Sequence, residues 1–182
     1  MELYRAGNIE SMVAIVGMRT ATLLALVIGV ANCITKGWVN KYGFSYKVFD
    51  RRATFDEAEA ACVAEGGHLA SIHSQEEDEF IYNISNPHAD QKTQSDLLWI
   101  GLRQKNWPKD KKWTWTDGTA VNFINWSRGE PNNLYNAEHC VELYTAPIKK
   151  HPHTKLKKWN DYRCNTKQSQ FVCKKVNLVC IE

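Results

Sequence analysis

The sequence predicts an α+β fold, with two helices early in the chain followed by strands and a long loop region. Two motifs typical of helix starts occur in the first half, at Thr54 and Ser74. A continuous apolar run at residues 97–102, LLWIGL, indicates a buried central strand. Helices and strands do not alternate along the chain, so we expect small antiparallel sheets rather than a parallel α/β sheet.

Each expected helix has a capping motif and an apolar face. In the first, over residues 54–64, Thr54 caps the N-terminus, Glu57 reaches back to it, and Gly66 ends the helix. Its inward face consists of Phe55, Ala58, Ala61 and Cys62. In the second, Ser74 and Glu77 form the same kind of box, and the helix extends to about residue 82 with Phe80 and Ile81 facing inward.

Four further segments are predicted to form strands. Residues 38–49 are aromatic and β-branched and are broken by Gly43, which is typical of a strand pair. Residues 113–116 alternate as a half-buried strand does, before a turn at Asp117-Gly118. Short core strands are expected at residues 140–143 and 171–174. Residues 118–159 otherwise show little regular pattern, and loops of that length in a compact domain are usually functional or mobile.

Length and charge limit the class of protein. The 182 residues fit one domain, expected at residues 32–182, behind a short N-terminal segment. Hydrophobic residues make up 43% of the chain, enough for a sizeable core. The formal net charge of +3 is mild, and no nucleic-acid partner is expected without a concentrated basic face.

The N-terminus has the pattern of a secretory signal. An apolar run at residues 21–31 follows Arg19, and small residues precede Asn32, so residues 1–31 are predicted to be a cleaved signal peptide. The run is shorter than the ~20 residues that span a bilayer. The alternative is a signal anchor that also uses the apolar residues 12–18, although Arg19 would then lie within the membrane at a high cost. We therefore expect a secreted protein, with the plasma membrane as the alternative location.

Cysteines and glycosylation motifs fit the same compartment. An even number of cysteines behind a signal segment is typical of a disulfide framework. No C-x-x-C spacing is present, so zinc or thioredoxin chemistry is unsupported. N-glycosylation motifs begin at Asn83 and Asn125, of which Asn83 is the better acceptor because Asn125 is flanked by Ile124 and Trp126. The six cysteines are Cys33, Cys62, Cys140, Cys164, Cys173 and Cys180.

Five short motifs, three of which contain or adjoin cysteines, follow one another along the chain. They are Trp99-Ile100-Gly101-Leu102, Glu130-Pro131-Asn132, Cys140-Val141, Trp159-Asn160-Asp161 with Cys164, and Phe171-Val172-Cys173. In this combination the chain resembles the C-type lectin domain over about residues 38–175. The resemblance implies the C-type lectin fold, with two helices, small antiparallel sheets and a long calcium-binding loop region.

The resemblance also implies how most of the cysteines pair. Cys62 would join Cys173, and Cys140 would join Cys164. A hairpin partner for Cys33 is missing, because Ser45 occupies the position where related domains often have a cysteine. We therefore predict a Cys33–Cys180 bridge within the chain. An intermolecular disulfide dimer is the alternative.

The resemblance also implies a single principal calcium site. Calcium takes six to eight oxygen ligands at ~2.3–2.6 Å. The residues that match the family's site are Glu130, Asn132, Glu138, Asn160 and Asp161. Related domains have a cis peptide bond before the proline, here Pro131, which can aim both neighbouring side chains at one point. A second calcium ion is not expected, because Arg103, Gln104, Lys105, Asn133 and His139 stand where further acids often lie.

The same five residues are expected to bind sugar. In related domains two adjacent hydroxyls complete the calcium shell, donate to carboxylates and accept from amides. The order acid-then-amide in Glu130-Pro131-Asn132 resembles the mannose-type site. It suits glycans with vicinal equatorial 3- and 4-hydroxyls, namely mannose, glucose, N-acetylglucosamine and, by its own geometry, fucose. Leu134 or Tyr135 is a candidate for contact with the sugar's apolar face.

The predicted function is a secreted, calcium-dependent lectin of mannose-type selectivity, acting in glycan recognition or innate immunity. The alternatives are a lectin-like domain that binds protein and a membrane-anchored lectin receptor. An enzyme is not expected, because the chain has no nucleophile elbow, H-E-x-x-H motif or acid pair outside the calcium set. The lysine-rich segment from Lys149 to Lys158 is a candidate for anionic glycans, although such runs are usually only solvated. One sugar site binds weakly, so an oligomer is a further expectation.

Overall fold

A computed structural model describes residues 37–85, 96–146 and 156–177 of the chain. The predicted signal segment, both Cys33 and Cys180, and most of the lysine-rich segment lie outside the described residues. Residues 37–177 form one compact unit with the predicted α+β architecture.

Helix α2, Phe55–Ala64, begins as the sequence predicts. Thr54 Oγ1 accepts the backbone N–H of Glu57, and the Glu57 carboxylate accepts the backbone N–H of Thr54, which completes the capping box. Phe55, Ala58 and Cys62 are buried. Gly66 has φ +82°, a left-handed conformation that glycine adopts without steric cost, and it ends the helix.

Helix α3, Gln75–Ile84, corrects one sequence-based expectation. Ser74 accepts the backbone N–H of Glu77, but the Glu77 side chain does not return to Ser74. It accepts instead from Lys174 Nζ at 2.6 Å and from the Tyr46 hydroxyl at 2.5 Å. Glu77 is therefore a buried ion-pair residue rather than half of a solvent-exposed capping box. Ile81 is buried as expected, whereas Phe80 is only partly covered.

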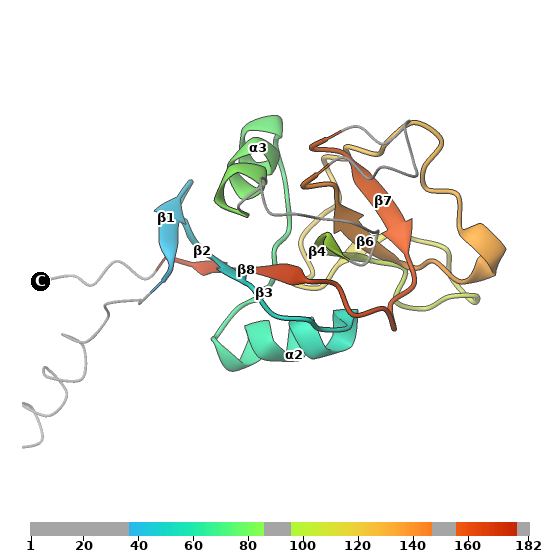
Figure 1. Cartoon of the computed structure of the whole chain (residues 1–182), viewed down its shortest axis with the longest axis horizontal. Helices are drawn as coiled ribbons and strands as arrows, with labels where there is room; N and C mark the ends of the chain where they lie inside the picture. The colour runs from blue at the N-terminus through green and yellow to red at the C-terminus, as the bar shows by residue number, and fades with distance from the viewer. Residues whose placement is uncertain (1–36, 86–95, 147–155, 178–182) are drawn as a thin grey trace, which may run out of the picture. The chain divides into compact units, whose positions relative to one another are not determined.

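The strands form one connected set rather than several separate sheets (Figure 1). Along its main path the order is β1-β2-β8-β4-β6-β7, with β3 beside β8 and β5 beside β4. All the pairings are antiparallel except that of β4 with β8. The bounds are β1 Val39–Lys41, β2 Phe44–Phe49, β3 His68–Leu69, β4 Leu98–Arg103, β5 Thr114–Trp115, β6 Cys140–Leu143, β7 Trp159–Tyr162 and β8 Gln170–Val176.

Strands β3 and β7 are not among the strands predicted from the sequence. Strand β7, with sequence WNDY, is short and polar, so its pairing with β6 leaves no periodic apolar signal. Its position matters, because it carries Asn160 and Asp161.

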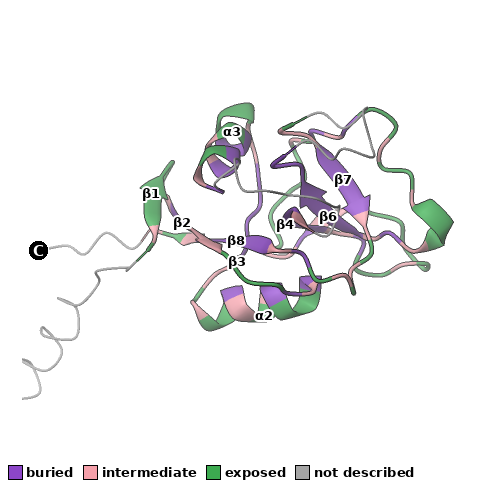
Figure 2. Ribbon diagram, viewed as in Figure 1, coloured by how far each residue is buried: buried purple, intermediate pink, exposed green. Residues whose placement is uncertain are grey.

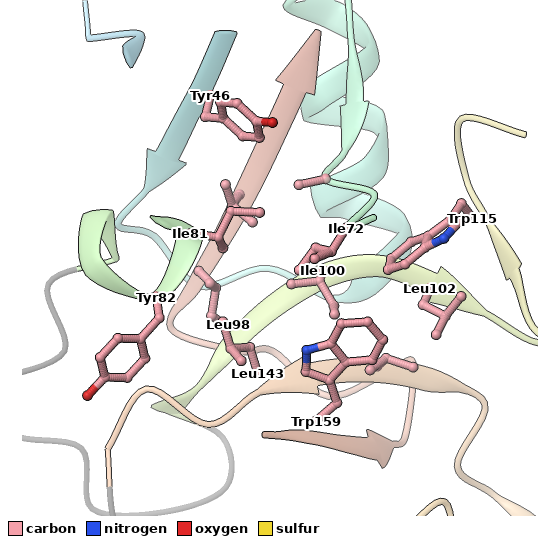
Figure 3. Packing of buried hydrophobic residues seen from close by; sticks show 13 residues of the cluster. Tyr46, Ile72, Ile81, Tyr82, Leu98, Ile100, Leu102, Trp115, Leu143 and Trp159 are labelled. Carbon is pink, nitrogen blue, oxygen red and sulfur yellow. The ribbon is translucent and has the colours of Figure 1, made fainter. Parts of the chain in front are cut away.

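The two larger apolar clusters of the described residues lie against the strands. Residues of α2 pack with Trp99, Phe171 and Cys173, while Ile81 of α3 packs with Val172 in the larger cluster. Successive side chains of β8 therefore serve different clusters, as expected for a strand covered on both faces. Figure 2 shows buried residues concentrated in the central strands, and Figure 3 shows Trp159 beside Ile100, Leu102 and Leu143 in the larger cluster.

The central strand β4 can accommodate only a glycine at position 101. A Cβ atom at this position would lie 2.4 Å from the backbone oxygen of Leu69. No real Cβ contact is that short, so any side chain would force β4 away from β3. The glycine thus permits the close approach that brings β4 into the core.

Within the described residues, two disulfides hold distant segments together. Cys62 on α2 is bonded to Cys173 on β8, across 111 residues. Cys140 on β6 is bonded to Cys164, just after β7, across 24 residues. Both are the pairs that the resemblance implied. Within the described ranges, no helix is long and apolar enough to cross a membrane.

Candidate functional site

Strands β6 and β7 bring the predicted site residues to one region. Their antiparallel register pairs Val141 with Asp161 and Glu142 with Asn160. Glu138 lies just before β6, and the Cys140–Cys164 disulfide joins the same two strands. Local pairing therefore places Glu138 and Asp161 close together, although they are far apart in the sequence.

The loop that contains Asn132 is attached to Asp161. The two carboxylate oxygens of Asp161 accept consecutive backbone N–H groups, from Asn132 at 3.0 Å and from Asn133 at 2.7 Å. The next amide, of Leu134, donates to Glu138 Oε2 at 3.1 Å. Asn133 Oδ1 in turn accepts the Glu138 amide at 3.2 Å. Two buried carboxylates thus fix the course of this loop through its backbone.

Glu130 lies at the other side of the same cluster. The Glu130–Pro131 peptide bond is cis, as the resemblance implied. Glu130 Oε2 is buried and has no hydrogen-bond partner among the described residues. Burial, together with the neighbouring Asp161 and Glu138 carboxylates, raises the pKa of Glu130 to about 7. An orphaned carboxylate oxygen beside two other acids is the feature that a bound cation would satisfy.

The pKa values of two neighbouring acids, Glu138 and Glu142, are also raised. Burial raises the pKa of Glu138, and Asp161 adds to the effect, whereas the Leu134 amide and Arg163 oppose it. The pKa of Glu142 is raised well above its usual value, first by burial and then by the charges of Glu138, Asp161 and Glu130. Burial and neighbouring carboxylates therefore destabilise the charged forms of Glu130, Glu138 and Glu142, which a bound cation would relieve.

The structure does not gather all five predicted ligands in the same way. Glu130, Glu138 and Asp161 converge, but the Asn132 side chain is exposed and takes part through its backbone. Asn160 is buried beside Asp161, with its amide directed at Glu142. No group of three His, Cys, Asp or Glu in the described part of the chain has a geometry ready to hold a metal ion. The oxygens of Asp161 and Glu138 are turned toward backbone amides instead.

Sequence reasoning missed two residues of this region, Glu142 and Gln168. Both are fully buried and bonded to each other, and Glu142 also binds Asn160. The available signal for Glu142 was a charged residue inside the predicted core strand at residues 140–143. Such an acid is almost never fully buried unless it has partners.

Two of the residues that argued against a second calcium ion, Gln104 and His139, interact with each other. His139 Nδ1 lies 3.2 Å from Gln104 Oε1, and the His139 ring stacks on Trp107 with centroids 4.6 Å apart. Gln104 Nε2 donates to the backbone oxygen of Lys111 at 2.6 Å. Gln104 and Trp107 border a pocket of about 340 Å³ whose lining also includes Trp113, Asn132 and Asp161.

A short exposed turn projects beside the acidic cluster. The backbone φ angles are positive at Asn133 (47°), Tyr135 (59°) and Asn136 (54°). Residues other than glycine adopt such angles at an energetic cost. Tyr135 is 78% exposed, and the Arg163 guanidinium lies 5.8 Å from its ring centroid. Strained, exposed residues of this kind often occur at binding sites, because folding alone does not favour them.

The described part of the chain is thus a two-helix α+β domain in which a disulfide-braced loop lies beside an acidic cluster. The chain matches the family model described as "Lectin C-type domain" over residues 51–175. It is 36% identical to a "C-type lectin" of Cerberus rynchops over 155 residues, covering 84% of this chain and 90% of the relative. It is 35% identical to "C-type lectin mannose-binding isoform" of Oxyuranus scutellatus, covering 78% and 82%.

A solved structure agrees with the sequence comparisons. The cow C-type carbohydrate-recognition domain of CD23, determined in the presence of a GlcNAc2Man3 oligosaccharide, superposes with a TM-score of 0.66 and 26% identity. The match covers 81% of this chain and 99% of that domain. The protein therefore belongs to the C-type lectin domain family, whose domains bind glycans and typically depend on calcium. Membership confirms the predicted fold and the expectation that the protein is not an enzyme.

Proposed function

We propose that the protein is a secreted, calcium-dependent lectin that binds mannose-type sugars at the acidic cluster. The observation that carries this proposal is the buried Glu130 oxygen, which has no partner among the described residues and lies against Asp161. A hard cation that prefers carboxylate and amide oxygens suits this donor set. Glu130, Asn132, Glu138, Asn160 and Asp161 are the residues proposed to hold calcium.

The same residues are proposed to bind the sugar. Bound calcium would supply a Lewis-acid contact for two adjacent sugar hydroxyls. Glu130 and Glu138 would accept hydrogen bonds from those hydroxyls. The Asn132 amide would donate to them, and so would the second N–H of the Asn160 amide, whose first N–H is bonded to Glu142. The acid-then-amide order on either side of Pro131 supports selectivity for vicinal equatorial 3- and 4-hydroxyls. The mannose-binding name of one relative and the mannose-containing oligosaccharide in the CD23 study agree with that choice.

Chromatography on immobilised mannan tests the proposal. The purified protein should be retained in millimolar calcium, released by a chelator, and released by free mannose at concentrations where free galactose has no effect. Calcium binding measured separately by calorimetry distinguishes two failures. Bound calcium without retention on any glycan would favour a protein ligand, whereas the absence of calcium binding would remove the basis of the site.

Secretion is part of the proposal and rests on the N-terminal sequence. Cleavage before Asn32 would leave residues 32–182 as the lectin domain, with the signal anchor and a plasma-membrane receptor as the alternative. Mass spectrometry of protein from a eukaryotic culture medium would determine the mature N-terminus. The same sample run without reductant would test the Cys33–Cys180 bridge, since a reducible dimer would contradict an intramolecular bond.

Two further proposals concern the surface. Asn83 is exposed near the end of α3 and is the proposed glycan acceptor, whereas the Asn125 amide is buried and donates to Asp78 and to the Lys157 backbone. In the lysine-rich segment, Lys158 binds Asn125 and Lys157 lies over the Tyr82 ring. Binding of anionic glycans is proposed for the lysine-rich segment from Lys149 to Lys158, of which residues 149–155 lie outside the described ranges. Glycan recognition in innate immunity is the proposed setting.

A further inference from the structure

A buried chain of hydrogen bonds runs from the backbone of Leu97 to the side chain of Asn160. The Leu97 N–H donates to Gln168 Oε1 at 3.0 Å. Gln168 Nε2 donates to one oxygen of Glu142, and Asn160 Nδ2 donates to the other at 2.8 Å. Gln168 and Glu142 have no exposed surface, and Asn160 is only 3% exposed.

When Glu142 is ionised, the form that a nearby calcium ion would favour, each hydrogen bond in this chain has only one possible direction. A backbone N–H can only donate, so Gln168 must present its oxygen to Leu97 and its nitrogen to Glu142. A carboxylate can only accept, so Glu142 takes one amide on each oxygen. Asn160 must therefore present its nitrogen to Glu142. Its oxygen, at the other end of the same planar amide, is turned away from Glu142.

The backbone holds this arrangement in place. Gln168 pairs with Ala53 through two backbone hydrogen bonds, of 2.9 and 3.0 Å. Glu142 and Asn160 are direct partners across β6 and β7, so their side chains lie on the same face of the pair. If Gln168 turned over, its nitrogen would face the Leu97 N–H, and if Asn160 turned over, its oxygen would face a Glu142 oxygen. Either mismatch leaves buried polar groups unpaired, which typically costs ~1–3 kcal/mol.

We propose that Glu142 is a positioning residue that holds Asn160 with its oxygen, rather than its nitrogen, available to calcium. This inference rests on the proposed function, because it assigns a role in the same cation site. Calcium takes only oxygen ligands. If the Asn160 amide were reversed, its nitrogen would replace its oxygen at the calcium site, and one ligand would be lost although Asn160 is still present. Residues behind a ligand commonly fix its orientation in this way, and their replacement weakens metal binding by about 10- to 100-fold.

The substitution Glu142→Gln would reverse Asn160 while preserving side-chain volume. Leu97 still fixes Gln168 with its nitrogen toward position 142, so the new amide must present its oxygen there. Its nitrogen then faces Asn160, which has to turn over to accept it. We expect E142Q to bind calcium about 10- to 100-fold more weakly than the wild type.

The double variant E142Q/Q168E should reverse that loss. A carboxylate at position 168 can accept from both Leu97 and the new amide, whose oxygen then again accepts from Asn160. The double variant has the same composition and buried charge as the wild type, with the two groups exchanged. We expect its calcium affinity, measured by calorimetry, to lie within about threefold of the wild type.

A second measurement needs no metal. In calcium-free protein labelled with ¹⁵N-asparagine, the Asn160 side-chain amide should exchange slowly with water in the wild type and in E142Q/Q168E. It should exchange faster in E142Q, where Nδ2 no longer faces a buried carboxylate. Wild-type calcium affinity in E142Q, or a double variant no tighter than the single one, would overturn the inference.

Another variant covers the possibility that E142Q fails to fold. In E142Q/N160D, the carboxylate at position 160 accepts from the new amide and supplies an oxygen whichever way it turns. It should bind calcium nearly as tightly as the wild type, and a tenfold deficit would contradict the inference. If the wild type itself binds no calcium, the proposed function and this inference both fail. Every other negative result leaves the proposed function standing.

Discussion

Asp161 Oδ2 accepts the backbone N–H of Asn133 at 2.7 Å, and this contact joins β7 to the loop that follows Pro131. Through it, a proposed calcium ligand also determines the path of the chain that carries Asn132. The conformation of the loop and the charge of the site therefore depend on the same carboxylate.

Replacement of Asp161 by Asn should affect both properties. An amide can accept only one of the two backbone N–H groups and turns a donor toward the other, a defect typically worth ~1–3 kcal/mol of unfolding free energy. Calcium binding should not saturate up to about 10 mM, at least tenfold above the range of extracellular calcium modules. Calorimetry and thermal unfolding provide the measurements.

Asp56→Asn is the matched control for that variant. Asp56 pairs with Arg103 at 2.8 Å, but its side chain is 74% exposed, so its loss should leave calcium affinity unchanged. Equal calcium affinity in D161N and D56N would remove Asp161 from the site.

Exchange of the groups around Pro131 should invert sugar selectivity. In E130Q/N132D the order becomes amide-then-acid, which reverses the donors and acceptors offered to the two hydroxyls. The ratio of galactose to mannose inhibition on a mannan surface should rise by at least about fivefold, or ~1 kcal/mol. The exposed Asn132 side chain can change without disturbing the core.

A calcium titration of the same variant provides its control. If E130Q/N132D binds calcium but neither sugar, the proposed hydroxyl geometry is wrong. If it retains mannose selectivity, the order of acid and amide is not what selects the sugar.

The buried carboxyl group of Asp78 should make the free energy of unfolding depend on pH. Burial raises its pKa from 3.8 to about 6, against hydrogen bonds from Trp159 and Asn125 and the charge of Lys158. The folded state thus holds this proton more tightly than the unfolded chain. The stabilising contribution is complete below pH 3.8 and is lost as the pH rises through about 6, a change of about 3 kcal/mol.

Comparison with Asp78→Asn isolates this group. The free energy of unfolding of the wild type minus that of D78N should fall between about pH 3.5 and pH 7, because only the wild type must ionise a buried acid. Urea unfolding at several pH values measures the difference. A constant or rising difference would show that Asp78 is not destabilised by its charge.

The two disulfides should contribute unequally to stability. In the chain-entropy model, a bridge across 111 residues contributes about 4.8 kcal/mol and one across 24 residues about 3.5 kcal/mol. Replacement of the Cys62–Cys173 pair by alanine should therefore cost more unfolding free energy than replacement of Cys140–Cys164. Calcium affinity should fall more when Cys140–Cys164 is replaced than when Cys62–Cys173 is replaced, because Cys140–Cys164 braces the acidic loop. Equal affinities would contradict that role.

Local signals in the sequence predicted local structure well. Thr54 and Glu57 form their box because both partners lie within one helical turn. Glu77 has the same spacing from Ser74, but its carboxylate is taken by Lys174, 97 residues away, and no local pattern contains that information. Strand β7 was missed for the same reason, since its pairing with β6 rather than its own polar sequence makes it a strand.

The candidate site was predictable only as a set of ligand types. The resemblance supplied the five residues, but not the fact that Asn132 takes part through its backbone in this structure. It also gave no sign of Glu142 and Gln168, whose roles depend on the orientation of amides in a buried hydrogen-bond chain. Such orientations follow from the complete set of neighbours and leave no trace in residue spacing.

The pairing of β2 with β8 brings Asn177 to the turn between β1 and β2, at one end of the domain, where the Asn177 N–H donates to Gly43 O at 3.2 Å. In Figure 1, β1 lies at that end, and the orange turn at Leu134–Asn136, beside the acidic loop, lies at the other. Copies of the domain gathered at the first end would present their loops in one direction. A flat array of sugars could then be bound by several weak sites at once, each raising the local concentration seen by the next.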